Sequence, residues 1–204
     1  WSYGGENVNA DGFHCGWSGH DARQARAALV RAAELGITHW DTADVYGDGR
    51  SEELIGGAWS DVPRDRIFLA TKVGWNRGGF PHYYDPELMR GQLEKSLRLL
   101  RTDRIDLYYL HHCDFGRRFE SALDFVRAAK KAGKIRFIGL SDWDDLKIMK
   151  YIDRVDPDVV QPYRNVTHDT FEKSGLSAWV EKRDAGVAFF SPIRHGLLLG
   201  KYDR

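Results

Sequence analysis

Apolar positions along the chain follow two alternating spacings. Short apolar and β-branched runs predict strands over residues 37–41, 67–74, 105–112, 135–142, 159–161 and 187–192. Between them, apolar residues at helical spacing predict helices over 22–35, 51–56, 86–100, 121–132, 145–153 and 177–184. Ser51 and Asp85 suit helix N-caps, and Pro86 suits a first helical position. The glycine-rich stretches 1–20 and 75–85 lack both periods and are predicted to be loops.

The alternation of strands and helices predicts a parallel sheet built from βα units, which recur roughly every thirty residues. Such a sheet closes into a barrel or stays open and doubly wound. An open nucleotide-binding sheet needs a G-x-G-x-x-G turn after its first strand, and the chain contains none. Polar residues at every strand tip favour the barrel. We therefore predict one α/β domain over residues 1–204, a (β/α)8 TIM barrel whose remaining strands fall before Trp1 and after Arg204.

The composition excludes several classes of protein. The 204 residues are 42% hydrophobic and include 30 basic and 30 acidic residues, so the formal net charge is zero. Nucleic-acid-binding proteins normally carry a basic excess, so we expect no nucleic-acid partner. No apolar run reaches the ~18 residues of a membrane-spanning helix, so we expect no membrane partner. Two cysteines, Cys15 and Cys113, are too few for a disulfide scaffold and indicate a reducing, cytoplasmic compartment.

Four chemically active side chains stand at or just beyond the ends of three successive predicted strands. They are Asp41, Tyr46 five residues later, Lys72 and His111. In βα folds the carboxyl ends of the strands carry the chemistry. Taken singly, each residue has an ordinary explanation as a strand-end cap, a surface residue or a core histidine. Their joint position favours a functional site.

These four residues together suit the delivery of a proton to an oxygen. A tyrosine hydroxyl, with a pKa of ~10, is a poor acid at neutral pH. The Lys72 ammonium is expected to lower the pKa of Tyr46, and a buried Asp41 to keep that lysine charged. His111 is placed to donate to a carbonyl oxygen and fix its position. The set lacks an electron source, which a hydride-donating cofactor would supply.

The residues around this site resemble a known family. Residues 36–47, Gly-Ile-Thr-His-Trp-Asp-Thr-Ala-Asp-Val-Tyr-Gly, and 51–56, Ser-Glu-Glu-Leu-Ile-Gly, are similar to the signature of the aldo-keto reductase superfamily. Further similar segments follow in family order at 70–74, 106–111, 133–141, 190–193 and 196–198. The resemblance covers nearly the whole chain. It implies a (β/α)8 barrel that reduces aldehydes and ketones with NADPH or, less often, NADH.

The resemblance also implies roles for individual residues. Tyr46 would be the proton donor, tuned by Lys72 and Asp41, and His111 would orient the carbonyl. The matching cofactor-binding positions are Asp41, Ser141, Asp142, Gln161, Phe190, Ser191, Ile193, Gly196, Leu198 and Lys201.

Within this cofactor set, Ser141 and Gln161 would bind the nicotinamide carboxamide and Phe190 would stack on its ring. Asp142 stands where the family usually has Asn, and an ionised Asp accepts hydrogen bonds but donates none. Residues 191–201 would surround the pyrophosphate. The adenosine-phosphate motif lies further on in the family, so the choice between NADP(H) and NAD stays open.

Two other interpretations compete with the reductase. The motif at 111–114, with His14 and Cys15, invites a metal site. Adjacent strand residues point to opposite faces and the spacing matches no usual zinc pattern, so we predict no metal. The other alternative is a cofactor-binding sensor with little turnover, like the channel β subunits of the superfamily.

The candidate substrate pocket is aromatic. Its candidate residues are Trp1, Trp75, Tyr83, Tyr84 and His112. Aromatic walls suit hydrophobic and sugar-like carbonyls equally. The expected partner is a small-molecule carbonyl substrate whose identity the sequence leaves open, as it does the oligomeric state.

Overall fold

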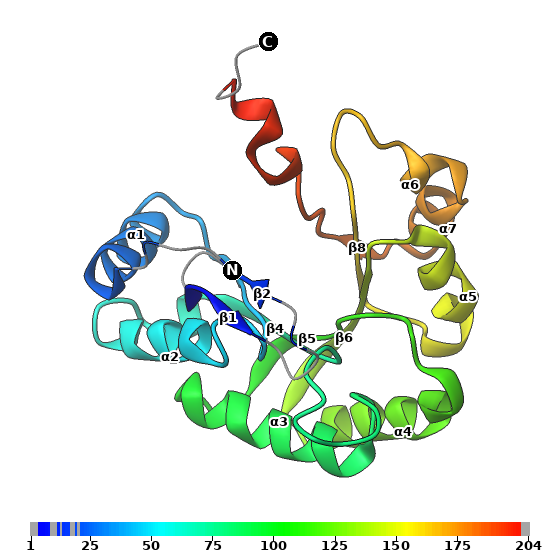
Figure 1. The fold of residues 1–204 in the computed structure, drawn as a ribbon, viewed down its shortest axis with the longest axis horizontal. Helices are drawn as coiled ribbons and strands as arrows, with labels where there is room; N and C mark the ends of the chain where they lie inside the picture. The colour runs from blue at the N-terminus through cyan, green and yellow to red at the C-terminus, as the bar shows by residue number, and fades with distance from the viewer. Residues whose placement is uncertain (1–3, 9–11, 13, 17–18, 20, 201–204) are drawn as a thin grey trace. The chain divides into compact units, whose positions relative to one another are not determined.

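Strands and helices alternate through the chain, as the apolar pattern predicts (Figure 1). The structure is a computed structural model that describes residues 4–8, 12, 14–16, 19 and 21–200. Its six-stranded sheet has the order β3-β4-β5-β6-β7-β8. These strands span His39–Asp41, Phe68–Val73, Ile105–Leu110, Ile135–Asp142, Val159–Pro162 and Gly186–Val187. The sheet order follows the chain order, which is the arrangement that successive βα units of a barrel produce.

Helices separate the strands, and aspartate side chains cap the starts of three of them. The helices are α1 (Ala22–Glu34), α2 (Arg50–Gly57), α3 (Pro86–Leu99), α4 (Phe119–Lys131), α5 (Asp145–Val155), α6 (Thr170–Lys173) and α7 (Leu176–Arg183). Asp21, Asp85 and Asp144 accept backbone N–H groups in the first turns of α1, α3 and α5. Among the described residues, no helix is long and apolar enough to cross a membrane.

The start of α2 differs from the sequence prediction. Ser51 is not its N-cap, because the helix begins at Arg50 behind Gly49. Gly49 has a φ of 93°, a left-handed conformation that glycine adopts without steric cost. The hydroxyl of Ser51 instead pairs with that of Thr42, at 2.8 Å. The serine therefore ties α2 to the end of β3.

Other differences concern short elements. The predicted strand at 187–192 is reduced to β8 and an isolated bridge between Tyr163 and Phe190. The stretch predicted as an N-terminal loop contains a pair of two-residue antiparallel strands, β1 (Asn7–Val8) and β2 (His14–Cys15). The four-residue helix α6 was not predicted, since it is too short to show a period.

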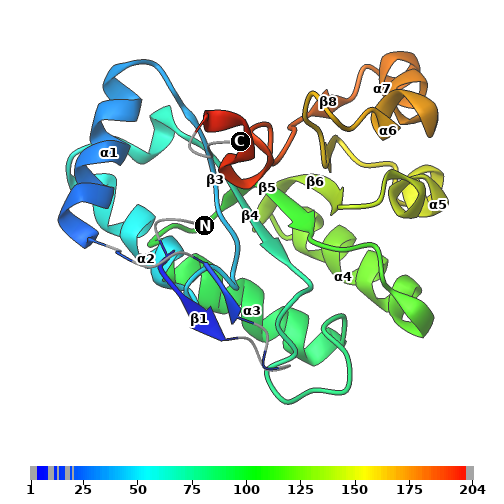
Figure 2. The same cartoon turned by 45° about the horizontal axis from the view of Figure 1, so that its top comes forward.

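Contacts divide the chain into two compact units. The first unit comprises Trp1–Tyr109 and Phe115–Arg136, and the second comprises Leu110–Asp114 and Phe137–Arg204. Within the first unit, α1 packs beside α2 and α3 beside α4, as both views show (Figure 1, Figure 2). The apolar sides of β4 and β5 form its core.

In the second unit, β6 and β7 run parallel with Ser141 opposite Gln161. The Asp158 carboxylate accepts the Ile138 N–H at 2.8 Å and fixes this pairing near its start. The apolar face of α5 is buried, and α7 packs on both α5 and α6. The register thus brings two predicted cofactor-binding residues side by side.

Asp106 joins several segments of the first unit. Its carboxylate accepts the Leu69 N–H at 3.0 Å, Arg64 at 2.9 Å and Arg136 at 3.0 Å, and the residue is only 3% exposed. Burial acts to raise the pKa of Asp106, but the hydrogen bonds from Leu69, Arg64 and Arg136 outweigh it and hold the pKa below its ordinary value. The ionised form is therefore the one that stabilises β4 and β5.

We predict that Asp106→Asn lowers the free energy of unfolding by about 3 kcal/mol, because it leaves Arg64 without its charged partner. Since the folded pKa is depressed, this stabilisation is present above ~pH 4 and is lost as the pH falls through the folded pKa. Urea unfolding at several pH values measures both effects. Asp65→Asn is the matched control, because Asp65 pairs with Arg104 at an exposed site and should change stability by at most about 0.5 kcal/mol. Equal losses in the two variants would contradict the prediction.

Candidate active site

Asp41, Tyr46 and Lys72 come together at the carboxyl ends of β3 and β4. Asp41 is the last residue of β3 and pairs in register with Ala70 of β4, two residues before Lys72. The Asp44 N–H donates to the Lys72 carbonyl at 3.3 Å, and the Tyr46 N–H donates to the Ala43 carbonyl at 3.1 Å. The turn after β3 is therefore folded over the end of β4, which places the tyrosine beside the lysine.

Lys72 is the centre of this group. Its ammonium donates to the Asp41 carboxylate and, at 2.7 Å, to the Thr42 carbonyl. It also hydrogen-bonds the Tyr46 hydroxyl and lies 5.1 Å from the centre of that ring. The residue is 1% exposed. An ammonium enclosed to this degree must have its donors satisfied, and these three partners do so.

The charges of the site follow from burial and pairing. Burial acts to lower the pKa of Lys72, but Asp41 and Tyr46 outweigh it, and the net direction is upward. The lysine is therefore a cation at neutral pH. A permanent cation beside the phenol is the electrostatic element that the sequence predicted.

The predicted direction of the Tyr46 pKa is wrong. Burial raises the pKa of Tyr46, and although Lys72 acts to lower it, the net pKa lies above its ordinary value. The motif shows the lysine beside the tyrosine, but it does not show the larger cost of enclosing a phenolate. A phenol is protonated at neutral pH at its ordinary pKa of ~10 and at any higher pKa, and this is the form that an acid requires.

Two buried carboxyl groups beside the site were missed from the sequence. Burial, reinforced by Glu52, raises the pKa of Asp44 to about 8. Burial raises the pKa of Glu52 to about 7, against a hydrogen bond that Thr71 donates at 2.7 Å. Glu52 shares the buried face of α2 with Ile55 and Gly56, three and four residues on, and that spacing was the available signal.

The packing of α2 explains why Glu52 is enclosed. A Cβ at Gly56 would lie 2.2 Å from the Leu99 carbonyl oxygen, so α2 and the end of α3 are in close backbone contact. Glu52 bonds to Thr71, the residue before Lys72, and Ser51 bonds to Thr42, the residue after Asp41. Helix α2 thereby holds both strand ends that carry the lysine and its carboxylate.

His111 belongs to the second unit, with most of the predicted cofactor residues. Strand β5 ends at Leu110, and the rings of His111 and His112 are stacked, with centroids 4.9 Å apart and planes 1° apart. The expectation that these side chains point to opposite faces is wrong, because neither residue is in the strand. Among the described residues, no group of three or more His, Cys, Asp or Glu side chains is placed to hold a metal ion.

The predicted carboxamide residues adjoin one another in the second unit. Ser141 and Gln161 are buried, and the serine hydroxyl lies 3.4 Å from the glutamine Oε1. Phe190 meets the ring of Trp143 edge to face at 4.7 Å and that of Tyr163 at 5.4 Å. In chemical type, the buried Gln161 amide suits the carboxamide of a nicotinamide and the Phe190 ring suits its pyridine ring.

The predicted pyrophosphate loop follows Phe190. Ser191 has a φ of 58°, and Gly196 and Leu198 lie in a 3-10 helix spanning Arg194–Leu199. Ile193 and Leu198 are 45% and 41% exposed. The Arg194 guanidinium donates to the Thr167 hydroxyl at 3.0 Å, so its present partner is a side chain of this unit.

The candidate substrate-binding residues are divided between the two units. Trp75 is half-buried in the first unit, and His112 is in the second. Tyr84 is fully enclosed, and its ring centroid lies 4.6 Å from that of Phe115, so it is a core residue. Trp1 and the cofactor candidate Lys201 lie outside the described residues.

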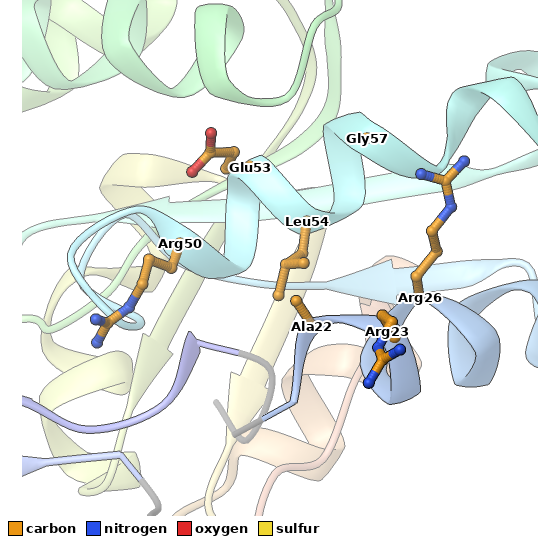
Figure 3. Close-up of a pocket in the computed structure, with 7 residues that line it drawn as sticks. All are labelled: Ala22, Arg23, Arg26, Arg50, Glu53, Leu54 and Gly57. Atoms are coloured by element: carbon orange, nitrogen blue, oxygen red, sulfur yellow. The ribbon is translucent and has the colours of Figure 1, made fainter. Parts of the chain in front are cut away.

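The first unit also contains a cavity of about 490 Å³ (Figure 3). It opens between α1 and α2 and is lined by Ala22, Arg23, Arg26, Arg50, Glu53, Leu54 and Gly57. Arg26 pairs with Asp61 at 2.6 Å, and Arg50 donates to the Gly4 carbonyl at 2.8 Å. None of the four candidate catalytic residues lines the cavity, so we do not assign it to the site.

Known proteins are similar to this chain in sequence and in fold. The profile of the Aldo/keto reductase family matches residues 10–204. An aldo-keto reductase, yakc [NADP(+)], of Schizosaccharomyces pombe is 33% identical over 98% of this chain and 62% of its own length. The chain spans about half to three fifths of the length of such curated relatives.

Solved structures give the same result. Aldo-keto reductase AKR11C1 from Bacillus halodurans superposes with a TM-score of 0.78 at 26% identity, over 98% of this chain and 70% of that one. The glycerol dehydrogenase AKR11B4 from Gluconobacter oxydans gives a TM-score of 0.78 at 31% identity, over 100% and 61%. The predicted fold class is confirmed by these neighbours.

We predict that the contributions of Glu52 and Asp44 to the free energy of unfolding fall as the pH rises from ~5 to ~8. Groups whose folded pKa is raised stabilise the protein below their unfolded pKa, and that contribution is lost as the pH rises through the folded values of about 7 for Glu52 and about 8 for Asp44. For each proton that only the folded state retains, the free energy of unfolding falls by ~1.4 kcal/mol per pH unit.

Glu52→Gln should remove the part of this pH dependence that Glu52 causes below pH ~7. Urea unfolding at several pH values across that range measures the difference. Glu53→Gln, on the exposed side of the same helix, should keep the wild-type slope. A Glu52→Gln slope equal to that of the wild type would show that Glu52 is not the group that retains a proton.

Proposed function

Because the chain belongs to the aldo/keto reductase family, we propose that it carries out the reduction of aldehydes or ketones to alcohols with NADPH. The observation that carries this proposal is the buried Lys72 ammonium, which contacts the Asp41 carboxylate and the Tyr46 hydroxyl at once. When bound, the nicotinamide supplies the hydride. The residues of this chain supply binding, orientation and the proton.

Tyr46 donates that proton to the carbonyl oxygen as negative charge develops there. Its hydroxyl is protonated at neutral pH, since its pKa lies above an ordinary value that is itself ~10. Lys72 stabilises the tyrosinate left behind, since a cation beside the phenolate favours the charged form. Asp41 keeps the lysine ammonium charged and oriented. His111 orients the carbonyl oxygen, a role we assign from its motif.

The cofactor assignment follows the family positions. Gln161 and Ser141 hold the carboxamide, and Phe190 packs against the nicotinamide ring. Ser191, Ile193, Gly196, Leu198 and Lys201 surround the pyrophosphate, and Asp41 and Asp142 complete the set. The name of the S. pombe relative specifies NADP(+), which supports NADPH as the donor here.

We propose a small-molecule carbonyl substrate bound by Trp1, Trp75 and His112. Similar proteins carry names that specify L-glyceraldehyde 3-phosphate and L-galactose as substrates, which favours small polyhydroxylated carbonyls. We further propose that residues 1–204 belong to one barrel domain. The low cysteine content favours a cytoplasmic location.

We predict that Tyr46→Phe lowers the rate of carbonyl reduction by about 10²-fold or more, the usual scale for loss of a general acid. The substitution keeps the ring and removes only the hydroxyl, so folding and NADPH binding should be retained. NADPH consumption with a panel of aldehydes, ketones and sugars measures the rate, and quenching of tryptophan fluorescence measures binding.

The matched control is Tyr151→Phe, which removes a phenol from α5 in the second unit, at none of the proposed catalytic or binding positions. It should keep the wild-type rate. Near-normal turnover of Tyr46→Phe with bound cofactor would remove Tyr46 as the donor and make His111 the next candidate. A wild-type protein that binds NADPH but consumes almost none would favour a sensor.

A further inference from the structure

The turn that carries His111 is tied to the elements after it by consecutive interactions within the second unit. The Cys113 N–H donates to an Asp142 carboxylate oxygen at 2.7 Å. The Cys113 thiol lies 3.8 Å from the Ser141 carbonyl oxygen as a weak donor. The next residue, Asp114, accepts from Lys147 of α5 at 2.6 Å. The turn is thereby held against the end of β6 and the start of α5.

Asp142 is the buried member of these contacts. It is 3% exposed, and its second carboxylate oxygen accepts the Asp144 N–H at 2.9 Å. Asp144 in turn caps α5 by accepting the Leu146 N–H. One carboxylate therefore receives backbone N–H groups from two segments, the turn at Cys113 and the start of α5.

The chemical identity of residue 142 suits this double contact. A carboxylate offers an acceptor on each oxygen, whereas an asparagine offers one oxygen and a donor NH2. If an asparagine replaced Asp142, one of the two backbone N–H groups would face the amide NH2 and lose its acceptor. The family usually has an asparagine at this position. The aspartate of this chain can accept the N–H groups of both Cys113 and Asp144, one on each oxygen.

We propose that Asp142 is a positioning residue that anchors the turn carrying His111, in addition to its place in the cofactor set. The effect on catalysis rests on the proposed function, since it acts through the orientation of His111. The anchoring itself does not, because it concerns only the hydrogen bond between Asp142 and the Cys113 N–H. The two parts can be measured separately.

The test of anchoring is the exchange rate of the Cys113 amide proton. The chain has two cysteines, so selective labelling with ¹⁵N-cysteine gives one backbone signal for each, and Cys15→Ser identifies that of Cys113. We expect Asp142→Ala to speed exchange at Cys113 about tenfold, because the turn opens more readily without its acceptor. Asp142→Asn should lie between this variant and the wild type.

Asp144→Asn is the matched control. It removes a neighbouring negative charge but keeps a good helix cap, so exchange at Cys113 should change by less than about twofold. If Asp142→Ala does not fold, the nearly isosteric Asp142→Asn carries the test. Unchanged exchange in both Asp142 variants would overturn the proposal.

The catalytic part is tested on the same variants. Anchoring predicts that kcat for carbonyl reduction, measured at saturating NADPH, falls in the same variants in which exchange at Cys113 is faster. Weaker NADPH binding with unchanged Cys113 exchange would show a cofactor ligand and no anchor. Faster exchange with unchanged kcat would show an anchor that does not position His111. Absence of reductase activity in the wild type would refute the proposed function and leave the exchange result valid.

Discussion

The burial of the Lys72 ammonium is the constraint on which the site depends. A charge enclosed in the interior is tolerated only when its hydrogen-bonding groups are paired. Here the partners come from the end of β3, the carbonyl just after it and the tyrosine of the following turn. Satisfying one lysine therefore fixes the ends of two strands and the path of the turn, and the same contacts place a cation beside a phenol.

The surroundings of the lysine carry further polar groups that the chemistry does not use. Ser51 and Glu52 attach α2 to the residues flanking Asp41 and Lys72. Burial raises the pKa of the Glu52 carboxyl to about 7, so it is largely protonated below neutral pH. A neutral carboxyl group can bind Thr71 without placing a second negative charge near the Asp41 and Lys72 pair. Below neutral pH, α2 thus supports the geometry of the site with little effect on its charge.

Much of the fold was accessible from the sequence because its signals are local. Apolar spacing located the long helices, and Asp85 and Pro86 marked the start of α3. The alternation of strands and helices placed Asp41 and Lys72 at one edge of a parallel sheet. The properties that the sequence does not reveal depend on burial and on contacts between residues far apart in the chain. The net direction of the Tyr46 pKa reflects burial, which no motif encodes. Asp142 receives its N–H from Cys113, 29 residues earlier, and such a pairing appears only when the strands are assembled.

The Lys72 ammonium acts directly on the Tyr46 phenol, so the pKa of that phenol should respond to removal of the lysine. Carbon NMR of ¹³C-labelled tyrosine, with Tyr46→Phe to identify the signal, measures it in the wild type and in Lys72→Met. We expect a Tyr46 pKa above the ordinary value in the wild type and a further rise in Lys72→Met, because burial then acts without the opposing cation. A Tyr46 pKa that is unchanged or lower in a folded Lys72→Met protein would contradict this expectation.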